Sequence, residues 1–300
     1  NTLVAIFRMA TPLIFIAMAA CIGRKANISS IAYEGMALFA ALCGALGSHY
    51  TSSLWLGALI GIAAGMLIAV IFAYFVLYLD TSPMLIGLAL NSLGNFGTIY
   101  MLFLITGRKS DSSTMVSQSF PTLSIPALKD VPVLGPLLNQ TNVLTYVAIL
   151  ATIIIFIVIY KTPFGLRLRS VGESPSAATS VGINVKKTQF IVMLISGFLA
   201  SMGGLFMSMA YLPYFTKNML SGRGFIGLAA CNLAAGHPIG AFACTLLFGA
   251  ADAIANVAQA FRLPAQFASM LPYIATIIGL CVTGYRASHV KIKKAKKAKA

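Results

Sequence analysis

The sequence predicts an all-α, polytopic membrane protein, and three observations lead to this fold class. Of its 300 residues, 59% are hydrophobic and only 9% are charged, whereas a soluble domain carries about 25% charged residues. The charged residues avoid several windows of about 20 residues, the length that an α-helix needs to cross a hydrocarbon core of about 30 Å. The positive charge is gathered in a few short segments. A soluble fold is therefore excluded.

Nine apolar segments account for the predicted crossings, and we expect eight to ten transmembrane helices within a single domain, residues 1–285. The first segment spans the bilayer if Arg8 extends its long side chain to the surface, and it ends at the basic residues Arg24 and Lys25. The segments are residues 3–22, 31–46, 54–79, 83–106, 143–160, 189–211, 224–235, 239–258 and 266–285.

Charge sets the predicted orientation. The net charge of +15 comes largely from residues 24–25, residues 161–187 and the basic tail, residues 286–300, and basic clusters mark the cytoplasmic side of a membrane protein. Residues 161–187 and the tail are therefore expected in the cytoplasm. Residues 107–141 are rich in Ser and Pro and predict an extracytoplasmic loop. We interpret the tail as solvated charge that fixes topology, and expect lipid rather than nucleic acid as its partner.

One predicted crossing is too short for a full span. Between the loop near residue 213 and the cytoplasmic tail an odd number of crossings is required, yet only residues 239–258 and 266–285 are long enough. Residues 224–235 supply the third crossing, although they rise only about 18 Å as an α-helix. An interrupted helix is tolerated inside a bundle where protein or a water-filled cavity satisfies its freed backbone groups. This pattern indicates a transport pathway.

Enzyme motifs are missing from the sequence. It contains no GxxxxGK[ST] phosphate loop, no HExxH and no GxSxG motif, and its three histidines are scattered. The five cysteines lie in or beside apolar segments without a CxxC pair, as small hydrophobic residues do. We therefore expect a transport subunit rather than an enzyme, with no metal or cofactor bound by this chain. In an ATP-driven system, ATP and Mg²⁺ would bind a separate subunit.

Two acidic residues, Glu34 and Asp252, lie within apolar segments. An ionised side chain at this depth is costly unless it is paired or hydrated, which makes each residue a candidate functional group. Three interpretations are open: hydrogen bonding to helix ends near a membrane face, lining of a substrate pathway, or proton relay in an ion-coupled secondary transporter. Neither acid has a basic partner nearby in the sequence.

Uncharged polar residues inside helices are the predicted substrate contacts. Asn91 and Asn95 are spaced to share one helix face with Thr98, and Phe96 lies beside them. An amide can recognise a sugar hydroxyl or a base edge while an aromatic ring stacks on the base. Hydrogen bonding between helices is an equally open interpretation of these amides. Further pathway candidates are Ser196, Phe206 and Asn232.

Several stretches resemble one family. Residues 8–13 read RMATPL, residues 31–36 read IAYEGM and residues 218–230 read NMLSGRGFIGLAA. The most specific stretch, residues 162–175, reads TPFGLRLRSVGESP and is followed by GINV at residues 182–185. Together they resemble the permease subunits of bacterial ABC importers of the nucleoside and simple-sugar type, relatives of ribose and branched-chain amino-acid permeases. The sequence departs from the family at residues 234–238, AAGHP, where the family has GRWNP.

The resemblance implies a permease that moves nucleosides across the bacterial inner membrane by alternating access. A pentose or other simple-sugar importer is the alternative, and an ion-coupled transporter a more distant one. The implied partners are a second homologous permease, an ABC ATPase subunit that holds ATP and Mg²⁺, and an extracytoplasmic substrate-binding protein. In the family, the cytoplasmic segment contains the coupling helix that docks on the ATPase. The matching residues here are Gly172, Glu173, Ser174, Pro175, Ala177 and Ala178.

Overall fold

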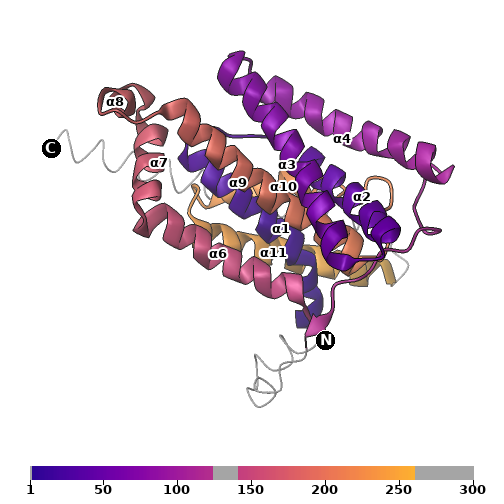
Figure 1. Cartoon of the computed structure of the whole chain (residues 1–300). Coiled ribbons are helices and arrows are strands. Elements are labelled where there is room, and N and C mark those ends of the chain that lie inside the picture. Colours follow the sequence, from indigo (N-terminus) through magenta and orange to yellow (C-terminus); the bar gives the residue numbers. More distant parts are fainter. Residues whose placement is uncertain (1, 124–140, 261–300) are drawn as a thin grey trace.

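The computed structural model describes residues 2–123 and 141–260, and over these residues the chain forms a helical bundle with one short strand pair (Figure 1). The predicted crossing at residues 266–285 and the tail, residues 286–300, lie outside the described residues. The elements are α1 (Thr2–Lys25), α2 (Tyr33–Thr51), α3 (Leu54–Tyr78), α4 (Pro83–Thr106), β1 (Thr122–Leu123), β2 (Thr141–Asn142), α6 (Val143–Lys161), α7 (Pro163–Glu173), α8 (Pro175–Ser180), α9 (Val185–Phe206), the π-helix η2 (Met207–Tyr211), α10 (Arg223–Leu233) and α11 (Pro238–Ala260).

Two helices form the centre of the bundle. α1 packs against α6, α9, α10 and α11, and its side chains from Met9 to Ile22 are all buried. α2 packs against α3, α4 and α9, and most of its side chains from Tyr33 to Ser48 are buried as well. A helix that is apolar on all sides is typical of such a buried position. The other helices therefore surround α1 and α2, and α4 lies at the edge of the bundle (Figure 1).

Six of the described helices are long and apolar enough to cross a membrane: α1, α3, α4, α6, α9 with η2, and α11. α2 is less apolar, but it needs no lipid-facing side because other helices surround it. α10 has only 11 residues and rises about 16 Å, so it crosses part of the bilayer. The predicted all-α, polytopic fold class is thus confirmed, including the short helix expected over residues 224–235. The total of eight to ten crossings stays a prediction.

Small residues allow the central helices to approach each other closely. A Cβ atom added at Gly61 of α3 would lie 2.7 Å from the Ala40 carbonyl oxygen of α2, and one at Gly65 would lie 2.9 Å from the Met36 carbonyl oxygen. A larger side chain at either position would therefore push the two helices apart. This GxxxG pair is used for packing within the chain.

The two ends of the bundle are formed by different segments of the chain. At one end, the C-terminal end of α1 meets α7, and the Lys186 ammonium lies 5.7 Å from the centre of the Tyr78 ring at the end of α3. At the other end, the loop after α4 pairs with the chain after η2, through backbone bonds such as Ser112 N to Phe215 O, 2.8 Å, and Lys217 N to Ser110 O, 2.9 Å. The first of these ends carries Arg24, Lys25, Lys186 and Lys187 and is called the basic end; it is the predicted cytoplasmic end.

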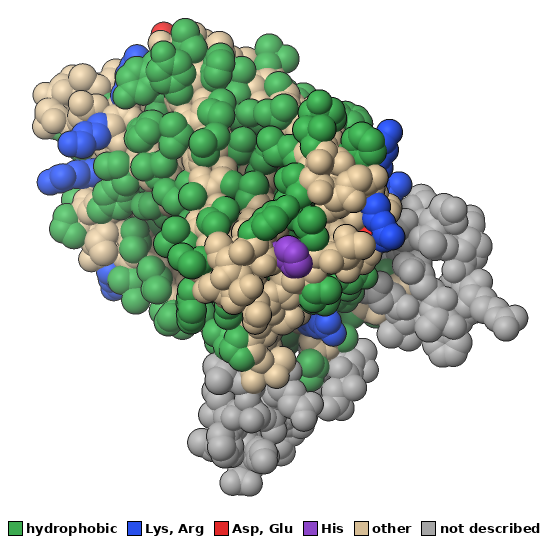
Figure 2. Space-filling model, turned by 45° about the vertical axis from the view of Figure 1, so that its right-hand side comes forward, with side chains coloured by type: hydrophobic (Ala, Val, Ile, Leu, Met, Phe, Trp, Pro, Cys, Tyr) green, Lys and Arg blue, Asp and Glu red, His purple; other side chains and the backbone are tan. Residues whose placement is uncertain are grey.

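Hydrophobic side chains cover most of the molecular face drawn in Figure 2, whereas Lys and Arg side chains lie towards its margins. This distribution suits a surface that is surrounded by lipid, with its charges near the headgroups. Arg8 follows the same rule: its guanidinium group donates to the Tyr211 carbonyl oxygen, 3.2 Å, and lies over the Tyr211 ring at the end of η2. The arginine therefore sits at a helix end rather than in the middle of the span.

Two helix boundaries differ from the prediction by more than three residues. α2 continues past residue 46 to Thr51, because its last turn is covered by the loop after α4, in which Gln118 N donates to Ser48 Oγ, 3.0 Å. α9 begins at Val185 rather than at residue 189, because the Asn184 side chain caps its first turn. In both cases a polar contact extends the helix beyond its apolar core.

Candidate functional site

The predicted cytoplasmic segment contains the helices α7 and α8 and the start of α9, and each of these helices begins at its own capping side chain. Thr162 Oγ1 accepts a hydrogen bond from Gly165 N, 3.1 Å, at the start of α7. Ser174 Oγ accepts from Ala177 N, 3.4 Å, at the start of α8, and Asn184 Oδ1 accepts from Lys187 N, 2.9 Å, at the start of α9. Such caps satisfy backbone N–H groups that otherwise lack a partner. The three helix starts are therefore defined locally.

α7 is amphipathic and packs on the bundle through one face. Its buried residues are Gly165, Leu168 and Val171, which follow helical spacing. Near its end, a Cβ atom at Gly172 would overlap the Lys25 carbonyl oxygen at the end of α1. Only glycine allows this approach of α7 to the central helix. The end of α7 is therefore in direct contact with the end of α1.

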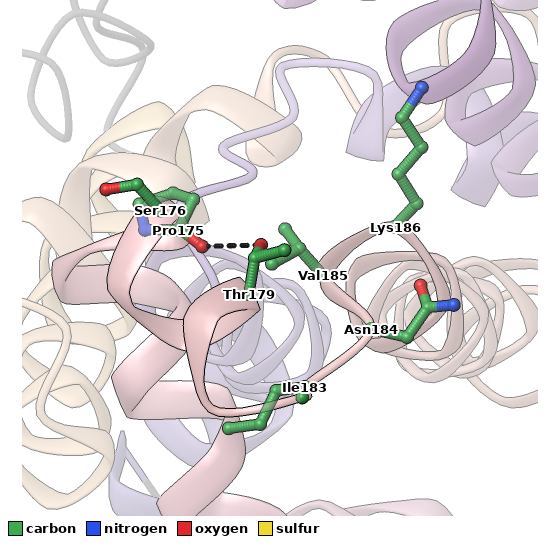
Figure 3. A pocket seen from close by; sticks show the side chains of 8 residues that line it. Pro175, Ser176, Thr179, Ile183, Asn184, Val185 and Lys186 are labelled. Carbon is green, nitrogen blue, oxygen red and sulfur yellow. Dashed lines mark hydrogen bonds between the residues drawn. The ribbon is translucent and has the colours of Figure 1, made fainter.

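α8 projects from the bundle, and of its residues only Ala178 is buried. An open hollow of about 610 Å³ lies between α8 and the start of α9 (Figure 3). The hydrogen bond from Thr179 Oγ1 to the Pro175 carbonyl oxygen, 2.9 Å, lies within α8 beside this hollow. The lining residues are Pro175, Ser176, Thr179, Gly182, Ile183, Asn184, Val185 and Lys186.

The residues predicted to couple to an ATPase divide into two groups. Glu173, Pro175 and Ala177 are exposed and are free to contact another protein. Gly172, Ser174 and Ala178 instead face the bundle or cap a helix, so they hold the exposed group in place. The sequence interpretation missed the second wall of the hollow, residues 182–186. Two residue types in the sequence could have indicated this wall: a glycine that can end a helix and an asparagine that can cap the next one. In the structure, Gly182 has a φ of +82° after α8, and Asn184 caps α9.

The surroundings of this hollow are basic. Lys186, Lys187 and Arg167 are exposed, whereas Glu173 is the acidic side chain in the segment. Arg169 lies over the Tyr160 ring at 5.5 Å. The end of the bundle around α8 therefore presents an excess of positive charge to a partner or to the lipid headgroups.

Both acids of the apolar segments meet the first residues of the short helix α10. Glu34 Oε1 accepts a hydrogen bond from Gly222 N, 2.9 Å. Arg223 Nη2 forms an ion pair with Asp252 Oδ2, 3.1 Å, and both side chains are largely buried. Hydrogen bonding to a helix end thus describes Glu34, and Asp252 has a basic partner that lies far away in the sequence. Glu34 Oε2 and Arg223 Nε are buried without a hydrogen-bond partner in the described part of the chain.

The opposite end of α10 is tied to α1. Arg24 Nη1 donates to Asn232 Oδ1, 2.7 Å, and to the Asn232 carbonyl oxygen, 3.4 Å. Asn232, a predicted pathway residue, therefore lies at the basic end of the bundle and pairs with the arginine of the predicted stop sequence. α10 is held at both ends, by α2 and α11 at its start and by α1 at its finish.

The remaining predicted pathway residues do not form one cluster. The Asn91 amide is buried and spans two backbone groups, accepting from Gly35 N and donating to Ile31 O, each 2.8 Å. Ser196 Oγ donates to the Ala19 carbonyl oxygen, 2.9 Å, and Phe206 is buried. Hydrogen bonding between helices, the second interpretation of the amides, describes Asn91 in this conformation. The substrate contacts stay predictions.

Asn95 and Phe96 differ from these buried residues. Asn95 is half-buried, and Phe96 exposes 74% of its side chain on the outer face of α4. In the described residues, no group of three or more His, Cys, Asp or Glu side chains is arranged to hold a metal ion. The expected absence of metals and cofactors from the chain stays a prediction.

Comparison with known proteins identifies the relatives of this chain. It is 34% identical to the guanosine ABC transporter permease protein NupQ of Bacillus subtilis, over 92% of this chain and 89% of the relative. It is 30% identical to the nucleoside ABC transporter permease protein NupC of Lactococcus lactis, with 91% and 88% covered. It is 27% identical to the putative glucose ABC transporter permease protein TsgC13 of Haloferax volcanii, with 96% and 93% covered.

In B. subtilis and in L. lactis, a second permease protein with the same named substrate also matches this chain. The family described as branched-chain amino acid transport system / permease component matches residues 2–280. With its apolar helices, the chain is a multi-pass protein of the inner membrane and a transport subunit rather than an enzyme. The chain therefore belongs to the permease family of ABC transport systems to which the branched-chain amino acid permease components belong.

Proposed function

We propose that this chain is one of two permease subunits of an ATP-driven importer, and that it carries nucleosides across the inner membrane. The observation that carries the ATP-driven part is the exposed helix α8 beside an open hollow at the basic end of the bundle. A projecting helix with its own cap is suited to dock into a groove of another protein. The sequence has no phosphate loop of its own, so the ATPase, with ATP and Mg²⁺, is a separate subunit.

The path of coupling follows from the packing. A partner that closes on ATP would move α8 and α7, and α7 pushes on α1 where Gly172 meets the Lys25 backbone. α1 packs on α10, and Arg24 of α1 is hydrogen-bonded to Asn232 at the end of α10. Since packed helices shift as rigid bodies rather than deform, movement at α8 reaches the short helix α10. Alternating access in this importer rests on that connection.

The substrate class is supported by the relatives. The two that are at least 30% identical are named for guanosine and for nucleosides, and the third is named for glucose. A simple sugar is therefore the second candidate substrate. Paired permeases in two of these organisms support a second permease subunit here. An extracytoplasmic binding protein would deliver the substrate to the outer end.

The test is uptake into proteoliposomes that contain the full complex, with the binding protein and ATP. We expect guanosine or another nucleoside to be taken up and to stimulate ATP hydrolysis, and glucose and ribose to do neither. Uptake of a sugar alone would move the proposal to the second candidate. Uptake that continues without ATP, driven by an ion gradient, would contradict the importer itself.

The docking surface has its own test. Exchanging exposed Ala177 for Glu adds a bulky charge to α8, and we expect the ATPase subunit to be lost from the purified complex while the second permease stays bound. Exchange of Thr114, exposed in the loop after α4 at the other end of the bundle, for Glu is the matched control, because it adds the same charge away from α8. An ATPase that co-purifies equally with both variants would contradict docking at α8.

A further inference from the structure

Polar side chains within most of the spanning helices face the protein. The exposed side chains of α3, from Trp55 to Tyr78, are aliphatic or aromatic. In α6, α9 and α11 the polar side chains near the middle of the span are buried, namely Thr152, Ser196, Ser201 and Thr245. These surfaces suit contact with lipid tails, because they leave no hydrogen-bonding side chain in the hydrocarbon core.

α4 is different. It packs on α2 and α3 through a narrow stripe of residues, and the rest of its surface is open. On that open surface, Ser92 is exposed, Asn95 is half-buried and Phe96 is 74% exposed. The residues of the packed stripe are Gly87, Leu90, Asn91, Gly94, Thr98 and Leu102. Ser92 therefore takes no part in packing among the described residues, and Asn95 lies at the border between the packed stripe and the open surface.

These polar groups lie near the middle of the span. At 1.5 Å per residue, Ser92 and Asn95 are about 14 Å and about 18 Å from the start of α4 at Pro83. A hydrocarbon core is about 30 Å thick. Neither side chain can reach the headgroups from this depth, since both are short. If α4 faced lipid here, a hydroxyl and an amide would be left in hydrocarbon.

Their hydrogen-bonding capacity is incomplete. Ser92 Oγ has no hydrogen-bond partner among the described residues, whereas Thr98 on the packed stripe donates to the Gly94 carbonyl oxygen, 2.6 Å. Asn95 Nδ2 donates to the Asn91 carbonyl oxygen, 3.2 Å, while its Oδ1 has no partner in the described part of the chain. The outer face of α4 thus offers a hydroxyl and an amide oxygen beside an exposed aromatic ring.

We propose that Ser92, Asn95 and Phe96 form one wall of the substrate path, at the seam between this chain and the second permease, and that they bind the base of a nucleoside. The Phe96 ring provides a stacking face, as aromatic residues do for bases in other binding sites. Asn95 and Ser92 provide a donor and acceptors for the polar edge of the base. Tyr100, 64% exposed one turn further along α4, extends the aromatic surface.

The second permease completes the site. α4 lies at the edge of the bundle (Figure 1), so the described part of this chain packs against α4 on one side only. A second, homologous chain that presents the matching face would enclose the substrate between two such walls. The inference rests on the proposed two-permease importer, and it adds the helix face that lines the path and the groups that contact the substrate.

The first experiment tests whether the wall meets water and substrate, in the full complex in nanodiscs. We compare the variants Ser92→Cys and Leu67→Cys, the latter near the middle of α3 on its open side, where Leu67 is 58% exposed, for reaction with a membrane-impermeant thiol reagent. The unmodified complex gives the background from the native cysteines. We expect S92C to react at least tenfold faster than L67C, and a nucleoside to slow it. Equal rates, or no protection by any nucleoside, would overturn the proposal.

The second experiment measures recognition. Phe96→Leu and Asn95→Ala should each raise the nucleoside concentration for half-maximal uptake at least tenfold, Phe96→Tyr should retain most activity, and Phe75→Leu on α3 should change nothing. If the F96L complex lost the second permease, Phe96 would be a structural contact rather than a substrate contact, and the proposal would be overturned. Unchanged uptake by the variants would overturn it as well. Import of glucose but no nucleoside by the unmodified complex would instead contradict the proposed substrate, and thiol labelling would still decide whether α4 lines the path.

Discussion

Helices that start at the basic end of the bundle are capped differently from helices that start inside the bundle. α7, α8 and α9 begin at a Thr, Ser or Asn that caps its own helix. α2 and α10 begin at Ala32 and Gly222, which have no capping side chain. Their N–H groups are satisfied by Asn91 from α4 and by Glu34 from α2. A locally capped helix keeps its start when it moves, whereas a helix capped from elsewhere depends on its neighbour's position.

The long-range caps form a chain of contacts through the membrane. Asn91 links α4 to α2, Glu34 links α2 to α10, and Arg223 with Asp252 links α10 to α11. The first two links are side chains that cap a neighbouring helix, and the third is an ion pair. A rearrangement of α4, which carries the proposed substrate wall, would therefore change the contacts of α10 and α11. The locally capped end would instead move as a block with its partner.

The largest effect is expected for the ion pair. Asp252→Ala leaves the Arg223 guanidinium without its partner in a largely buried place, which should lower the free energy of unfolding by about 3 kcal/mol. The measurement is denaturant unfolding of the purified complex in nanodiscs. The double variant Asp252→Ala with Arg223→Ala should recover part of the loss, because no unpaired charge remains. Equal losses in the single and double variants would contradict a buried pair.

The cap from α4 to α2 should come second. Asn91→Ala removes two hydrogen bonds and leaves Gly35 N–H and Ile31 C=O unsatisfied, at an expected cost of about 2 kcal/mol in the free energy of unfolding. Ser92→Ala is the matched control, because the next residue faces outward and has no partner in the described chain. Equal stability of the two variants would show that α2 does not rely on the Asn91 amide.

The cap from α2 to α10 should follow. Glu34→Ala removes the acceptor for Gly222 N–H and should cost about 1 kcal/mol of unfolding free energy. Glu34→Gln keeps an acceptor oxygen in place, so we expect its unfolding midpoint to stay near that of the unmodified protein. A Gln variant as unstable as the Ala variant would mean that the charge of Glu34, rather than its capping bond, is what α10 requires.

The smallest effect is expected at a local cap. Ser174→Ala removes the acceptor for Ala177 N–H and should cost about 0.5 kcal/mol, because α8 is exposed and short. The change should appear as faster hydrogen exchange confined to α8. Thr162→Ala, its counterpart at α7, should affect α7 in the same confined way. Faster exchange that spreads into α10 from either variant would erase the distinction between the two kinds of cap.

The sequence predicts the locally determined features well. Apolar runs without charge predict α3, α4 and α6 close to their observed bounds, and the parity of crossings predicts the short helix α10. The coupling segment carries Thr, Ser and Asn caps that can be recognised without a structure. Such signals depend on residues within a few positions of one another.

The long-range features could not be predicted in the same way. The sequence marks Glu34 and Asn91 as polar residues in apolar segments, but their partners, Gly222 and Gly35, contribute backbone N–H groups that every residue but proline has. The partner of Asp252 lies in another helix that comes earlier in the chain. Which polar side chains face outward on α4 follows only from how α4 leans on α2. Tertiary packing, not local pattern, decides these points.

The burial of α2 has a consequence for how the protein enters the membrane. α2 falls below the apolarity expected of an independent spanning helix, and its first turn is capped by Asn91 of a helix made later. We therefore expect the newly synthesised chain to hold α2 poorly in the bilayer until α3 and α4 have been inserted beside it. Chains that stop before Pro83 should leave α2 outside the hydrocarbon core, and biogenesis of the whole protein should depend on the insertion of α4.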